Sequence, residues 1–165
     1  MAERQDPDLL QPALLDRLID LDPDLDRDPP VPAAAQPAGL REALRRDLEM
    51  LLNTRCRPIT PSEHLPELRG SLLNLGVGDF FSSSLVTPEQ RQAFAADLQR
   101  RIALFEPRLE NLSVTLQQDA APERRSLHLR ISAEFRMQPG LPPMIFESRV
   151  DPVGGLFSVS EGRHG

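Results

Sequence analysis

A chain of 165 residues is long enough for one domain with tails, and its single cysteine, Cys56, cannot form an internal disulfide. The net charge is −6, and residues 1–30 carry all of this excess because they hold nine acidic residues and three Arg. The rest of the chain is neutral, so it lacks the basic surface that nucleic-acid binding requires. The sequence contains neither a signal peptide nor a stretch of about 18 apolar residues, and we therefore expect a cytoplasmic protein without membrane insertion.

Residues 1–38 are predicted to form an acidic N-terminal segment that precedes a domain of residues 39–165. Apolar residues at helical spacing within residues 12–21 predict a short amphipathic helix. The apolar face comprises Leu14, Leu15, Leu18 and Ile19. So short a helix is only marginally stable alone, and it must lie either in a groove of a partner or on its own domain. Residues 22–38 are rich in Asp-Pro and Pro-Ala and predict an extended linker.

Two longer helices are predicted within the domain. The first covers residues 40–53, where leucines share one helical face. The second begins at residues 87–90, because Thr-Pro-Glu-Gln combines an N-cap Thr, Pro at the first helical position and Gln at the third. It ends near Phe105, since a proline two residues later disfavours helical geometry before it. Between the helices we expect a loop over residues 56–70, then a turn or two of helix and a buried loop over residues 71–81.

The C-terminal part of the chain alternates apolar and polar residues, which is typical of half-buried strands. A first strand follows residue 108, and a second covers residues 127–137 without a break in phase. A third covers residues 144–150, and a short fourth covers residues 156–160. The fold class is therefore predicted to be α+β: two main helices pack on a C-terminal antiparallel sheet of three to four strands, and the other face of the sheet meets water.

No set of residues predicts a catalytic, cofactor or metal site. The histidines are His64, His128 and His164. They are far apart in sequence and match no ligand spacing. Cys56 has no adjacent base to activate it as a nucleophile. Glu106 is a candidate general acid, but the neighbouring Arg108 favours its ionised form. We therefore predict that the protein is not an enzyme.

The Glu106-Pro107-Arg108 junction follows the second long helix and has two interpretations. In the first, Pro107 ends the helix and Arg108 complements the negative C-terminal end of the helix dipole. In the second, the proline fixes the backbone so that Glu106 and Arg108 point rigidly at a partner. Both interpretations can hold at once.

Five short motifs occur in one order along nearly the whole chain. They lie at residues 14–18, 51–55, 71–76, 105–109 and 151–159. Together they resemble the TssE family, the small baseplate subunits of bacterial type VI secretion, which are similar to the wedge protein of contractile phage tail baseplates. The resemblance implies a structural subunit that docks the wedge proteins TssF, TssG and TssK and templates a sheath of TssB and TssC. It also implies a protein that is monomeric alone, is present in several copies in the baseplate, and uses Glu106, Pro107 and Arg108 to contact the wedge core.

The edge of the predicted sheet offers a second docking site. Strands of unequal length leave an open edge, and an incoming strand pairs with such an edge by main-chain hydrogen bonds. The candidate residues are Leu156, Phe157, Ser158 and Val159. With the helix residues Leu14, Leu15 and Leu18, they complete the predicted partner-binding set. The alternative function is a lysozyme-like hydrolase that cleaves peptidoglycan, since members of the resembled family have carried that label.

Overall fold

The computed structural model describes residues 18, 23–26, 36–57, 64–78, 87–117, 127–135, 143–150 and 155–162. The chain divides into two compact units, residues 1–44 and 45–165, and the second contains the sheet. The predicted helix of residues 12–21, with Leu14 and Leu15, lies outside the described residues except for Leu18, whose side chain is exposed. The predicted domain boundary near residue 38 stays a prediction.

The first long helix, α2, spans Gln36–Asn53 and begins four residues before its predicted start. Pro37 is tolerated in its first turn because the N–H groups there have no partner within the helix. Its predicted leucine face is buried. The residues of that face are Leu40, Leu44, Leu48, Leu51 and Leu52.

The second long helix, α3, spans Pro88–Phe105 as predicted. The hydroxyl of Thr87 accepts a hydrogen bond from the N–H of Gln90 at 3.3 Å, and the N–H of Thr87 donates to Oε1 of Gln90 at 3.0 Å. This reciprocal pair is the capping box that the sequence predicts. Leu98 and Ile102 on the inner face of α3 have no solvent exposure.

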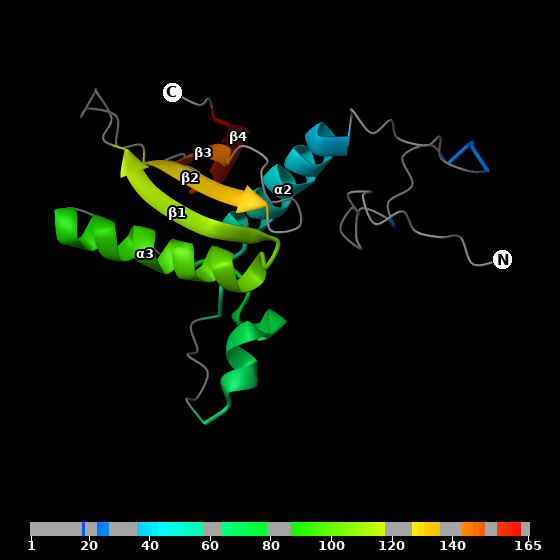
Figure 1. Cartoon of the computed structure of the whole chain (residues 1–165). Helices are drawn as coiled ribbons and strands as arrows, with labels where there is room; N and C mark the ends of the chain where they lie inside the picture. The colour runs from blue at the N-terminus through cyan, green and yellow to red at the C-terminus, as the bar shows by residue number, and fades with distance from the viewer. Residues whose placement is uncertain are drawn as a thin grey trace. The chain divides into compact units, whose positions relative to one another are not determined.

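Four strands form one antiparallel sheet in the order β1-β2-β3-β4 (Figure 1). The strands are β1 (Leu109–Gln117), β2 (Leu127–Phe135), β3 (Met144–Val150) and β4 (Phe157–Glu161). The predicted α+β class is confirmed. The fourth strand starts one residue later than predicted, since Leu156 lies before it with 60% of its surface exposed. Met137, at the end of the predicted second strand, lies outside the described residues.

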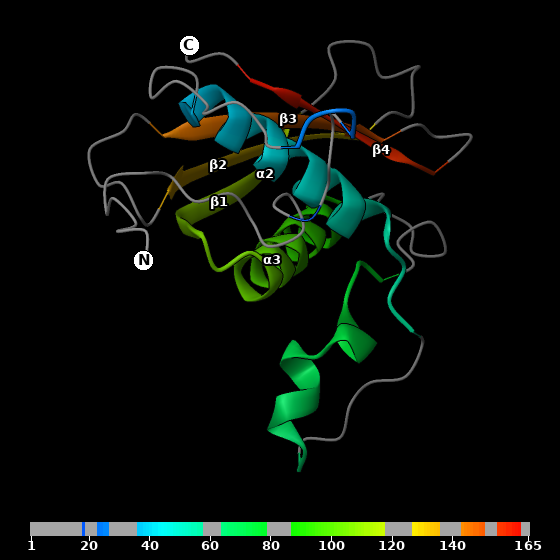
Figure 2. The same ribbon diagram turned by 90° about the vertical axis from the view of Figure 1, so that its right-hand side faces the viewer.

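One face of the sheet is buried and the other meets water, as predicted. Along β2, Leu129, Ile131, Ala133 and Phe135 are buried, whereas the alternate residues are half-buried. The second half of α2, from Arg45 onward, and α3 cover the buried face (Figure 2). Leu48 and Leu98 supply fully buried helix side chains to this core, and such burial is the main favourable contribution to folding.

The segment between the helices differs from its prediction. It contains two 3-10 turns, η1 (Pro66–Gly70) and η2 (Leu72–Asn74), so the predicted loop over residues 56–70 is wrong at its end. Pro66 stands at the first position of η1, where proline favours a turn. Leu72 is 84% exposed, whereas Gly76 and Val77 beyond it are buried. The predicted turn of helix is therefore present, but its leucine faces water.

Gly76 closes this segment against the end of α2. The N–H of Val77 donates to the carbonyl of Thr54 at 2.7 Å, and the N–H of Cys56 donates to the carbonyl of Val77 at 3.1 Å. Gly76 has φ of +105°, and a Cβ added there would lie 2.3 Å from the carbonyl oxygen of Thr54. Only glycine fits both this left-handed conformation and this close approach. Arg101 of α3 donates to the carbonyl of Gly76 at 2.8 Å and so ties the segment to the core.

Candidate docking sites

The Glu106-Pro107-Arg108 junction connects α3 directly to β1. Glu106 is the C-cap residue of α3, and its N–H donates to the carbonyl of Ile102 at 2.8 Å. The carbonyl of Glu106 then accepts from the N–H of Leu109 at 3.1 Å, which closes a tight turn into the strand. Pro107, between them, is exposed. The junction therefore presents its proline outward while its ends are held by the backbone.

The charged side chains of the junction point at one another. Nε of Arg108 donates to Oε1 of Glu106 at 2.5 Å, and Nη2 of Arg108 donates to Oε2 of the same carboxylate at 2.5 Å. Nη2 also donates to Oδ2 of Asp47, on α2, at 2.5 Å. Glu106 is only 7% exposed. The hydrogen bonds that Arg108 donates to Glu106 and Asp47 raise the pKa of Arg108 above its already high ordinary value, so the cation is permanent.

This network pairs one cation with two carboxylates, and it joins α2, α3 and the start of β1. Arg108 has a planar fork that matches a carboxylate in a bidentate arrangement. Neither predicted interpretation of the junction included the contact with Asp47. Sequence reasoning missed Asp47, because it lies 61 residues from Arg108 and no local pattern links the two. The use of Glu106, Pro107 and Arg108 in partner docking stays a prediction, and Pro107 is the most exposed of the three.

The outer edge of β4 is the second candidate site. Phe157 and Val159 direct their side chains into the core, whereas Ser158 is exposed on the other face. The side-chain amide of Asn53, the last residue of α2, bonds twice to the backbone of Phe157. Nδ2 donates to the Phe157 carbonyl at 2.9 Å, and Oδ1 accepts from the Phe157 N–H at 2.8 Å. Arg45 donates to the carbonyl of Val159 at 3.1 Å.

The opposite edge of the sheet, along β1, differs in kind. The register with β2 shifts between Glu110 and Ser113, and Asn111 has φ of +50°, so the strand carries a bulge. Gln99 of α3 accepts a hydrogen bond from the N–H of Val114 at 3.3 Å. Helix α3 runs alongside the strand (Figure 1). Bulges and covering elements are two devices by which proteins block a sheet edge.

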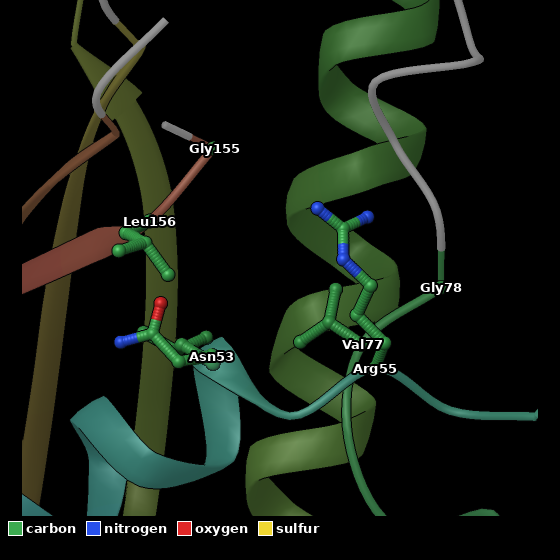
Figure 3. A pocket seen from close by; sticks show the side chains of 7 residues that line it. Asn53, Arg55, Val77, Gly78, Gly155 and Leu156 are labelled. Carbon is green, nitrogen blue, oxygen red and sulfur yellow. The ribbon is translucent and has the colours of Figure 1, made fainter. Parts of the chain in front are cut away.

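A small pocket lies where α2 ends beside the start of β4. Figure 3 shows Asn53 directed toward Leu156, while Arg55 extends along α3. The lining residues are Leu52, Asn53, Arg55, Val77, Gly78, Gly155 and Leu156. They are apolar except for one amide and one guanidinium, and they include no acid or histidine for catalysis.

Within the described parts of the chain, no group of three or more His, Cys, Asp or Glu is placed to hold a metal ion. Cys56 is half-buried, and its backbone pairs with Val77. His128 lies on the half-buried polar face of β2, and His164 lies outside the described residues. Among the described helices, none is long and apolar enough to cross a membrane.

Comparison with known proteins identifies a family. The model of the family described as baseplate wedge protein gp25 matches residues 38–140, which is more than half of the chain. The match includes nearly all of α2 and the whole of α3, β1 and β2, and with them Asn53 and the Glu106-Pro107-Arg108 junction. No curated protein matches the chain.

Proposed function

The chain belongs to the baseplate wedge protein gp25 family, and from this premise we propose that it is the TssE-type wedge subunit of a type VI secretion baseplate. Family membership indicates a structural role in a phage-tail-like baseplate. The five ordered motifs support the secretion assignment over a phage one. On this proposal the protein acts in the cytoplasm, docks TssF, TssG and TssK, and templates the first ring of TssB and TssC sheath subunits by strand pairing.

The observation that carries the docking role is the rigidity of the junction. A bidentate ion pair and two backbone hydrogen bonds hold Glu106 and Arg108, so the exposed Pro107 between them has a fixed position. A surface fixed before binding loses little conformational entropy on association. The wedge partner would therefore meet Pro107 and the adjacent backbone, while the ion pair acts as a support beneath them.

The β4 edge supports the templating role. Both outward backbone groups of Phe157 and the outward carbonyl of Val159 bond to side chains of α2. Such bonds can be exchanged for the main-chain bonds of an added strand. The β1 edge has a bulge and lies alongside α3, so β4 is the edge at which we expect the sheath strand to pair.

No observation favours the alternative of a peptidoglycan hydrolase. A general acid must hold a proton that it delivers to the leaving group. Both oxygens of Glu106 instead accept hydrogen bonds from Arg108, and Asp47 shares the same cation. A structural family also gives no support for turnover.

The docking proposal is tested by Pro107→Ser, which alters the exposed residue and leaves the ion pair in place. We expect co-purification with TssF and TssG to fall at least about tenfold, with an unchanged unfolding midpoint. Gln92→Ser, on the exposed surface of α3, is the matched control and should bind as the wild type does. Equal capture of Pro107→Ser and wild type would show that the junction serves the fold alone.

A further inference from the structure

Asn53 bonds to β4 as a neighbouring strand would. In an antiparallel sheet, one residue exchanges both its N–H and its C=O with the residue opposite. The side-chain amide of Asn53 reproduces this pair, because it donates to the carbonyl of Phe157 at 2.9 Å and accepts from its N–H at 2.8 Å. A single amide group thus occupies a complete pairing position of the edge.

The direction of each β4 residue follows from the end of the strand. The N–H of Gly162 donates to the carbonyl of Ile145 in β3 at 2.7 Å. Because the N–H and C=O groups of successive residues point to opposite sides of a strand, those of Ser158 and Ser160 also bond inward to β3. Phe157, Val159 and Glu161 therefore direct their N–H and C=O groups outward, away from the sheet.

Arg45 holds a further outward group. It donates to the carbonyl of Val159 at 3.1 Å, and it is also paired with Glu49 one turn along α2, which orients the guanidinium. Asn53 and Arg45 together hold both groups of Phe157 and the carbonyl of Val159. Within the described residues, the structure shows no hydrogen bond to the outward groups of Glu161.

We propose that Asn53 and Arg45 form an edge cap, which closes the first half of β4 in the free protein and is displaced when an extended strand is added. The strand would first pair at Glu161, where the described residues supply no cap, and then replace Arg45 and Asn53 in turn. This inference rests on the proposed templating function and deepens it, because it assigns a regulatory part to the end of α2. Exposed edges also pair indiscriminately with other chains, and the cap limits that hazard until a partner strand arrives.

The exchange is balanced in hydrogen bonds. Each side-chain bond of the cap is replaced by a main-chain bond of the added strand, so the displacement leaves no buried group unpaired. An ordinary hydrogen bond changes an equilibrium constant by a factor of roughly five. The two bonds of Asn53 therefore oppose strand addition by a factor of roughly 30, which a strand of several residues overcomes and a chance contact does not.

The first test is amide hydrogen exchange in Asn53→Leu, which keeps the side-chain size and removes both bonds. We expect the Phe157 amide to exchange at least about fivefold faster, with the Ser158 and Ser160 amides unchanged because they bond to β3. The control is Thr54→Val, which removes the adjacent hydroxyl bond to Met50 but touches no strand edge. Faster exchange at all three β4 amides would mean that Asn53 supports the fold, and it would overturn the proposal.

The second test uses a second copy of the protein as the strand probe, measured by sedimentation equilibrium. We expect Asn53→Leu to self-associate at concentrations roughly 30-fold lower than wild type. Adding Glu161→Pro should reverse this, since it removes an outward N–H and no β3 bond. The proposed cap would be overturned if the Phe157 amide exchanges faster in Asn53→Leu but this variant self-associates no more strongly than wild type. The exchange and sedimentation results test the cap without reference to the proposed function. The proposed templating function fails separately, if wild-type protein does not bind TssB and TssC.

Discussion

Removal of the Arg108 side chain tests the account of the junction most directly. The Arg108→Ala substitution leaves the carboxylate of Glu106, which is 7% exposed, without its bidentate partner. It also breaks the bond to Asp47, the contact that ties the junction to a helix 61 residues away. We therefore expect loss of stability through a stranded charge as well as through lost bonds.

The magnitude follows from the depth of the site. The side chains of Arg108, Asp47 and Glu106 are 20%, 19% and 9% exposed, so solvent screens the network only in part. Removing one partner of a buried ion pair costs about 3–5 kcal/mol, and this part-buried site should lie near the lower value. The free energy of unfolding of a domain is only about 5–15 kcal/mol, so the variant should be markedly less stable.

The assay is equilibrium unfolding in urea, with the slope of the transition used to check that the folded and unfolded states stay the same. Adding Glu106→Gln to Arg108→Ala removes the stranded charge and should restore about 1–3 kcal/mol. Arg100→Ala is the control, because its ion pair with Asp97 is largely exposed and should contribute less than about 1 kcal/mol. A loss below about 0.5 kcal/mol for Arg108→Ala, or no recovery in the double variant, would refute the reasoning.

Two further substitutions test other parts of the domain. Gly76→Ala should destabilise the domain by more than about 2 kcal/mol in the same urea assay, because its Cβ would meet the carbonyl of Thr54 at 2.3 Å and its φ is +105°; a neutral effect would contradict the described backbone. A backbone hydrogen bond, with a second from Thr87, lowers the pKa of the exposed Glu89 in the first turn of α3. The contribution of Glu89 to stability is thus complete above the ordinary carboxyl pKa and is lost as the pH falls through the lowered pKa. Glu89→Gln should therefore reduce the small decrease of the urea midpoint that accompanies acidification. An unchanged pH dependence of the midpoint would contradict the assignment.

Local patterns predicted the parts of the fold that local interactions determine. The capping box at Thr87 depends on residues within one turn, and the alternation along β2 depends on a period of two, so both were visible in the sequence. The bulge at Asn111 was not, because a left-handed residue within a strand depends on its pairing with the neighbouring strand. The start of β4 was displaced by one residue, an ordinary uncertainty at the end of an element.

Both candidate sites depend on contacts that no sequence window contains. Arg108 meets Asp47 across 61 residues, and Asn53 meets Phe157 across 104. The sequence predicted the junction and the last strand as docking sites, but not that α2 holds each of them. That helix was predicted correctly as an amphipathic element, yet its contacts with the two candidate sites come from polar residues beside the leucine face.

The unlike edges of the sheet have a consequence for assembly geometry. Along β1 the bulge at Asn111 is a feature of the backbone itself, whereas the Asn53 contact on β4 comes from one side chain at a helix end. With the Asn53 contact displaced as proposed, the sheet can be lengthened on the β4 side only. In the proposed templating function, each molecule would then act as a polar seed, and the direction in which strands accumulate would be set before the first sheath subunit arrives.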